Sequence, residues 1–89
     1  MIKIVEAKYM TEYKVELIFS THEKGIVDFS YLISKETELT KPLKDDAFFK
    51  NFFIELGAIG WQNGLELSPK SLYQKLSKEN VLNEVEISA

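Results

Sequence analysis

The sequence contains no cysteine and a single histidine, His22, so it has few groups that bind metals or act as nucleophiles. The absence of cysteine excludes disulfides and thiolate metal ligands. His22 lies in the polar segment 20–25, where it is typical of an exposed turn, and a zinc site would need two or three further nitrogen or sulfur ligands. The chain also lacks a Gly-x-Ser-x-Gly elbow, a phosphate-binding glycine loop and a His-Glu-x-x-His sequence. We therefore predict no enzyme, no cofactor, no metal site and no catalytic residue.

Arginine is also absent: all 11 basic residues are lysine, and the net charge is −3. Arginine supplies the bidentate donors that read guanine and phosphate, whereas lysine supplies only a point charge. A domain with net negative charge is repelled by nucleic acid. We therefore expect no nucleic-acid binding by this domain alone, although a dimer with lysines gathered on one face would allow it. A genome rich in A and T is an equally good explanation of the lysine bias.

No apolar run approaches the roughly 18 residues of a membrane span, and Glu6 and Lys8 make the N-terminal segment unlike a signal peptide. We therefore expect no membrane partner and a cytoplasmic location. The 89 residues have an ordinary globular composition, 45% hydrophobic and 28% charged, which suits one small domain. We predict a single α+β domain over residues 1–76, followed by a C-terminal tail over residues 77–89.

Alternating apolar residues predict an antiparallel meander of three strands, at 2–8, 13–19 and 26–29. In the middle strand the apolar side chains are expected to share one face, because successive residues point to opposite sides of a sheet. That face is expected to carry Tyr13, Val15, Leu17 and Phe19. Gly25 is expected to adopt a positive φ in the turn before the third strand.

Two short helices are expected after the meander. Ser30 is expected to cap the first helix, and Asp45 or Asp46 the second. The segment 35–41 between them is expected to be extended, because a proline follows it. The chain is then expected to change from helix to strand near Asn51. The four phenylalanines on either side of that change are interpreted as core and edge packing; they are Phe48, Phe49, Phe52 and Phe53.

The segment 56–69 is the most informative, because it holds three of the four glycines and the only tryptophan. Gly57-Ala58 is expected to form a type II′ turn and Asn63-Gly64 a type I′ turn, on either side of a strand at 59–62. These turns predict a β-hairpin. The fold class predicted for the whole chain is therefore α+β, with an antiparallel three-stranded meander followed by short helices, a β-hairpin and a C-terminal helix.

The C-terminal helix has a clear beginning, with Ser68 as its N-cap and Pro69 at its first position. Its buried stripe is expected to contain Leu72, Tyr73 and Leu76. Two outcomes are open for the tail. In the first, the helix continues through Val81 and Leu82, and residues 85–87 add an edge strand to the sheet. In the second, the tail becomes ordered only against a partner.

Trp61, Asn63 and Glu66 are the candidate binding residues, because they lie together in the predicted hairpin. Glu66 is an acid close to an indole, a setting that can raise the pKa of a carboxyl group by desolvation. The alternative is a carboxylate that faces solvent. Trp61 is expected in the core with a partner for its N–H, whereas an exposed Trp61 would anchor a binding surface.

Two segments, 28–32 and 57–73, resemble a bacterial family of small α+β domains of unknown function. The family motif reads G-[GA]-I-x-W-x-N-G-x-[DE]-L-S-P-x-x-L-Y, and the resemblance covers residues 2–76. Gln62 stands where proline is common in the family, and the tail after Leu76 departs from it. The resemblance implies a domain found alone or joined to a helix-turn-helix domain, often encoded beside another small protein as in toxin–antitoxin pairs. It implies no catalytic residues.

These observations support three functional hypotheses. The leading one is a non-enzymatic protein-interaction module with a protein partner, as the antitoxin-like or regulatory member of a bacterial two-protein system. An acidic domain with an open sheet edge and an apolar tail suits that role. The second is a small-ligand-binding or accessory enzyme domain that uses Trp61 and Glu66. The third is a DNA-associated regulator that acts as a dimer.

Overall fold

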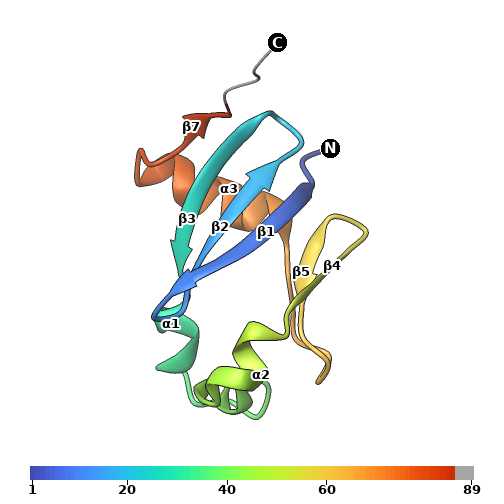
Figure 1. The fold of residues 1–89 in the computed structure, drawn as a ribbon, viewed down its shortest axis with the longest axis vertical. Coiled ribbons are helices and arrows are strands. Elements are labelled where there is room, and N and C mark those ends of the chain that lie inside the picture. Colours follow the sequence, from blue (N-terminus) through green and yellow to red (C-terminus); the bar gives the residue numbers. More distant parts are fainter. Residues whose placement is uncertain (86–89) are drawn as a thin grey trace.

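The computed structural model describes residues 1–85 and contains two antiparallel sheets joined by short helices (Figure 1). The predicted α+β fold class is confirmed. The elements in chain order are β1 Ile4–Thr11, β2 Lys14–Phe19, β3 Glu23–Asp28, α1 Ser30–Ile33, the 3₁₀ helix η1 Lys41–Lys44, α2 Asp46–Lys50, β4 Phe53–Glu55, β5 Ala58–Gly60, β6 Glu66–Leu67, α3 Pro69–Lys78 and β7 Asn83–Glu84. Within residues 1–85, no helix is long and apolar enough to cross a membrane.

The larger sheet has the strand order β1-β2-β3-β7, and α3 lies behind it in the view of Figure 1. The alternation predicted for β2 is confirmed, because Val15, Leu17 and Phe19 are all fully buried. Tyr13, at the end of the same face, is half-buried and packs edge-on against the ring of Phe49. One face of the meander therefore forms the core, and the other face meets solvent.

The smaller sheet, with the strand order β4-β5-β6, is attached to the start of β1. The Ile4 amide donates to the carbonyl of Gly57 at 2.8 Å, so the hairpin tip and the N-terminal strand are held side by side. A Cβ at Gly57 would lie 2.7 Å from the Cβ of Lys3, a distance that real side chains do not adopt. Glycine at position 57 thus permits the two sheets to meet.

A cluster of aromatic rings fills the space between the sheets and α2. Trp61 is 2% exposed, and its ring centroid lies 5.8 Å from that of Phe49 and 6.0 Å from that of Phe29. The Trp61 Nε1–H donates to the Phe49 carbonyl at 2.9 Å, which satisfies the only polar group of the indole. The interpretation of Trp61 as a core residue with a partner for its N–H is confirmed.

The turn between β2 and β3 differs from the prediction. The residue with positive φ is His22, at 68°, and Gly25 lies inside β3. Gly25 is needed there for another reason, because a Cβ would come within 3.0 Å of the Leu76 Cδ1 atom of α3. The small residue therefore permits the close packing of α3 on the sheet, and the prediction of a glycine turn was wrong.

Both hairpin turns also differ from the predicted types. Leu56 and Gly57 form the first turn, with φ values of 52° and 84°, which is typical of type I′ and not of the predicted type II′ turn at Gly57-Ala58. In the second turn only Gly64 has positive φ, at 94°, and its amide donates to the Trp61 carbonyl. That arrangement suits a type I turn followed by a left-handed glycine, so the predicted type I′ turn was wrong.

The two short helices were predicted correctly, but the cap of the first was not. Ser30 is the first residue of α1, and both its amide and its hydroxyl donate to the Asp28 carboxylate. These hydrogen bonds lower the pKa of Asp28. For α2 the prediction is confirmed, because the Asp45 side chain accepts from the Ala47 amide.

The segment between the two helices is not extended as predicted. Thr40 is buried and exchanges hydrogen bonds with Thr37, which closes a turn. Pro42 then lies near the start of η1, where its missing N–H removes no helical hydrogen bond. The hydrogen bonds between the exposed Thr37 and the buried Thr40 therefore override the preference for an extended backbone before proline.

The start of α3 agrees with the prediction, because the Ser68 hydroxyl accepts from the Ser71 amide and Pro69 is the first helical residue. Leu72 and Leu76 are buried and Tyr73 is half-buried, as the stripe predicted.

The end of α3 differs from the prediction. The helix stops at Lys78 because Asn80 adopts a φ of 58°, and the Val81 amide bonds back to the Leu76 carbonyl, as in a Schellman motif. The predicted extension through Leu82 was therefore wrong. An edge strand is present at Asn83–Glu84, earlier than predicted, and part of the predicted segment 85–87 lies outside the described residues. The domain boundary after residue 76 stays a prediction.

We predict that Gly64→Val lowers the free energy of unfolding by about 1–3 kcal/mol, because a β-branched residue is strained at positive φ. No atom lies within 4 Å of a Cβ built at Gly64, so a steric clash contributes nothing to this loss. The measurement is urea-induced unfolding followed by Trp61 fluorescence.

Gly64→Asn is the matched control for this turn, since asparagine tolerates the left-handed region, and it should lose much less stability. Equal stability of the valine variant and the wild type would contradict the observed turn geometry.

Candidate functional site

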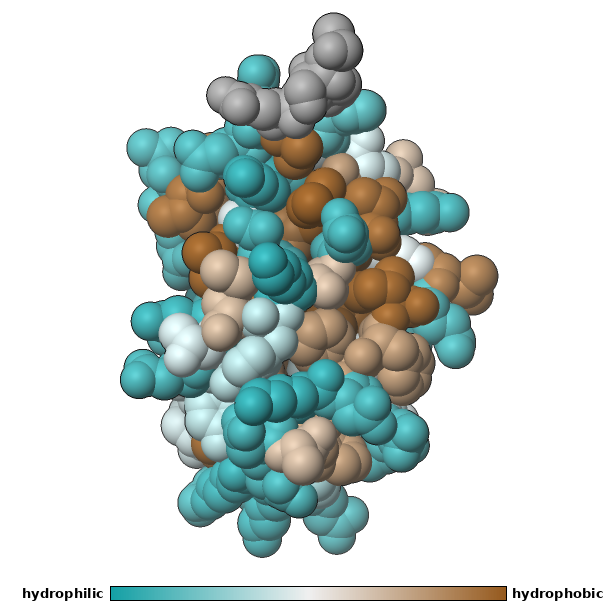
Figure 2. All heavy atoms as spheres, in the orientation of Figure 1, coloured by the Kyte–Doolittle hydropathy of each residue, from teal (hydrophilic) through white to brown (hydrophobic). Residues whose placement is uncertain are grey.

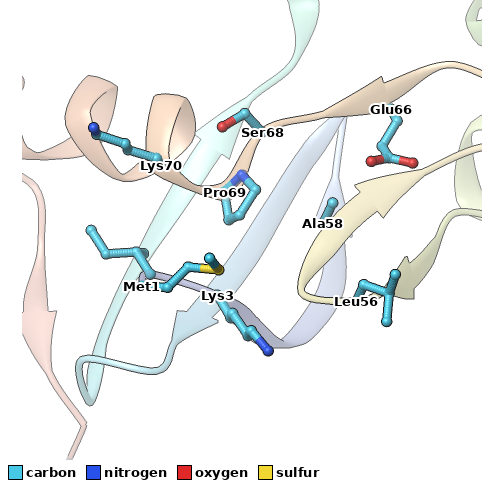
Figure 3. A pocket seen from close by; sticks show the side chains of 9 residues that line it. Met1, Lys3, Leu56, Ala58, Glu66, Ser68, Pro69 and Lys70 are labelled. Carbon is cyan, nitrogen blue, oxygen red and sulfur yellow. The ribbon is translucent and has the colours of Figure 1, made fainter.

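An open groove of about 720 Å³ lies where the N-terminal segment, the β4–β5 hairpin and the start of α3 meet (Figure 3). Met1 and Lys3 lie on one side of it, Leu56, Ala58 and Glu66 on another, and the α3 residues above. Its volume is within the range of about 300–1,000 Å³ that is usual for binding sites. The lining residues are Met1, Ile2, Lys3, Leu56, Ala58, Glu66, Ser68, Pro69 and Lys70.

Leu56 is the most unusual residue of the groove. Its side chain is 91% exposed, and its backbone has a φ of 52°. Leucine at positive φ is disfavoured because its Cβ crowds the neighbouring carbonyl oxygen. Burial of a leucine side chain ordinarily stabilises a fold, but a side chain this exposed gains almost none of that stabilisation. The turn therefore holds a large apolar side chain in solvent at a local conformational cost.

The charged side chains of the groove are those of Lys3, Lys70 and Glu66, and all three residues are exposed. The ion pairs formed within residues 1–85 join Lys44 to Glu36, Lys50 to Asp46 and Lys75 to Glu79, and none of them includes a groove residue. The groove thus presents two lysines and one carboxylate around an apolar floor.

The structure does not bring the three predicted binding residues together at this groove. Glu66 lines it, but Trp61 is buried in the core and presents no ring at the surface. Asn63 holds the hairpin loop: its Nδ2 donates to the Leu39 carbonyl at 2.9 Å, and its Oδ1 accepts from the Leu65 amide. Asn63 therefore links the loop to the segment before η1.

Glu66 of β6 pairs with Gly60 of β5, and Glu66 is exposed to solvent. The desolvated setting beside an indole is therefore not formed, and the alternative of a solvent-facing carboxylate agrees with the structure. Sequence reasoning missed Leu56. The signal for it was an apolar residue directly before Gly57 in a two-residue turn, a position where asparagine or aspartate is preferred.

A polar contact outside the groove lies near the middle of α3. The Tyr73 hydroxyl donates to the Glu23 carboxylate at 2.5 Å, and this hydrogen bond raises the pKa of Tyr73. The contact fastens α3 to β3. Within the described residues 1–85, no group of three or more histidine, cysteine, aspartate or glutamate side chains is arranged to hold a metal ion.

Comparison with known proteins gives one match. The family model described as protein of unknown function (DUF2442) matches residues 4–77. This range contains nearly all of α3 and every strand of the two sheets except β7. No curated protein matches the chain, and no solved structure matches it.

We predict that Trp61→Phe lowers the free energy of unfolding by about 2–4 kcal/mol, since it leaves a cavity and removes the donor to the Phe49 carbonyl. Thermal unfolding followed by circular dichroism measures this loss. Phe53→Leu is the control, because Phe53 is 40% exposed and its replacement should cost less than about 1 kcal/mol. Equal losses for the two variants would argue against the core position of the indole.

Proposed function

We propose that this chain, which belongs to the family described as protein of unknown function (DUF2442), is a non-enzymatic protein-interaction module. Its contact surface is the groove beside α3, and Leu56 is the residue that a partner buries. Within this proposal, the chain is the antitoxin-like or regulatory member of a two-protein system. That finer role is supported by the family resemblance alone.

The observation that carries the proposal is the conformation of Leu56. Its φ of 52° places it where asparagine is favoured, yet the side chain is 91% exposed and gains little from burial within the chain. Residues in disfavoured backbone conformations are concentrated at functional sites, where another requirement outweighs the local cost. For an exposed leucine, that other requirement is contact with a partner that buries its side chain.

The setting of Leu56 supports the same role. The hairpin that carries Leu56 is held in place by the hydrogen bond from the Ile4 amide to the Gly57 carbonyl. The Leu56 side chain is therefore presented on a fixed turn. A turn whose backbone is already held in place loses little backbone freedom on binding, and preorganisation of this kind raises affinity. The neighbouring groove provides the concave surface into which a partner would fit.

The decisive test is Leu56→Asn. Asparagine favours the left-handed backbone conformation, so the variant should be more stable than the wild type by about 1 kcal/mol. Its affinity for the partner should fall by about tenfold or more, as for a central interface residue. The partner to co-express is the protein encoded by the adjacent gene. Affinity is measured by isothermal titration calorimetry on the purified proteins.

Ile26→Thr is the matched control, because Ile26 is 46% exposed on the opposite face of the larger sheet. It should leave the affinity unchanged. A Leu56→Asn variant that bound its partner as tightly as the wild type would overturn the assignment of the groove. A variant with lower stability than the wild type would show that Leu56 serves the fold itself.

A further inference from the structure

We propose that the groove accepts a partner segment whose apolar side chains are flanked by carboxylates. This inference rests on the proposed function and specifies the chemistry of the partner. The groove combines an apolar floor with two lysines, and these two features select different parts of the same ligand.

Four of the five apolar residues that line the groove are labelled in Figure 3, and they come from three separate segments. Met1 and Leu56 are strongly exposed, Ala58 is 8% exposed and Pro69 is half-buried. In Figure 3 these side chains surround the same open space. Burial of apolar surface stabilises a complex by roughly 25 cal/mol per Å² before the costs of association are subtracted. Aliphatic side chains of a partner are therefore favoured at the floor.

The charged part comes from Lys3 and Lys70, which belong to different elements and line the same groove, with their side-chain nitrogens at its outer edge in Figure 3. Neither of them forms an ion pair in the part of the chain that the structure describes. Lys70 also lies in the first turn of α3, where the helix dipole disfavours a positive charge. A carboxylate from a partner would offset the unfavourable interaction of Lys70 with the helix dipole. Glu66 supplies one negative charge to the groove, against the two positive charges of the lysines.

A protein segment suits this groove better than an extended anionic surface does. The chain carries a net charge of −3, so a membrane of anionic lipids or a nucleic acid would be repelled by the molecule as a whole. A short acidic segment, in contrast, meets mainly the local field of the two lysines. Local complementarity of this kind selects the partner and guides its approach.

The exposed face of the larger sheet does not offer the same combination. Figure 2 shows brown and teal residues interleaved over this face. Cross-strand neighbours there alternate in charge and type, since Lys8 lies opposite Glu16, and Glu16 lies opposite Ile26. A surface with both signs of charge paired across the strands favours no single sign of partner.

The proposal is tested with four synthetic peptides. Two contain leucine and glutamate, one in strict alternation for an extended segment and one with helical spacing. The other two carry lysine in place of every glutamate. Each peptide is titrated into the isotopically labelled protein, and the amide shifts are followed by NMR. We expect one Leu/Glu peptide to bind, with the largest shifts at Lys3, Ala58, Glu66 and Lys70, and neither Leu/Lys peptide to bind.

Charge-reversal variants provide the second measurement. Lys3→Glu and Lys70→Glu should each weaken binding of the Leu/Glu peptide by about threefold to fivefold, the effect of an exposed charge pair. Lys78→Glu is the matched control, because Lys78 is an exposed lysine at the far end of the same helix. It should leave binding unchanged. A higher salt concentration should weaken binding of the Leu/Glu peptide to the wild type. The same increase in salt should weaken its binding to the two groove variants less.

Several outcomes would overturn the inference. They are equal binding of Leu/Glu and Leu/Lys peptides, shifts confined to the exposed face of the larger sheet, and no binding of either Leu/Glu peptide. Binding to anionic vesicles without binding to the Leu/Glu peptides would also overturn it, in favour of a lipid surface. If none of the peptides binds but Leu56→Asn still reduces affinity for the protein partner, the proposed function stands and only the acidic chemistry is wrong.

Discussion

The hydrogen bond from the Trp61 indole to the Phe49 carbonyl connects parts of the chain that local interactions leave apart. Trp61 follows the second strand of the hairpin, Phe49 belongs to a five-residue helix, and Phe29 follows the meander. A helix that short is not stable alone, and neither is an isolated hairpin. The indole packs against both phenylalanine rings, so each element is stabilised by contacts with the others. The small sheet and its exposed tip are therefore held on a rigid core.

Several turns of this protein contain residues other than glycine at positive φ, namely Glu12, Tyr13, His22, Glu36, Leu56 and Asn80. His22 and Asn80 each serve a neighbouring element: His22 directly precedes β3 and its carbonyl accepts from the Val85 amide, and Asn80 terminates α3. The Leu56 side chain makes no comparable contribution to the fold, because it remains in solvent. Leu56 also differs from His22 and Asn80 in residue type, because histidine and asparagine tolerate positive φ better than leucine does.

The groove depends on a backbone contact between segments far apart in the sequence. The Ile4 amide reaches the Gly57 carbonyl only because Gly57 has no side chain to strike Lys3. This contact brings the N-terminal segment beside the hairpin, and the capped start of α3 completes the third side. The three groups of lining residues have no common local pattern, since each belongs to a different element. Their proximity is a product of the packing of the two sheets.

The sequence by itself determined the features that depend on near neighbours. Alternation in β2, the Asp45 and Ser68 caps and the helix start at Pro69 were all predictable, because each is decided within a few residues. Turn types were not, because the register of β4 and β5 moved the first turn to Leu56-Gly57, and packing on Leu76 placed Gly25 inside a strand. Only the tertiary structure decided that the Phe49 carbonyl is the partner of the Trp61 N–H, that Asn63 links to Leu39 and that Glu66 lines the groove. The physical reason is that burial and long-range contact depend on how the elements pack, which local preferences do not specify.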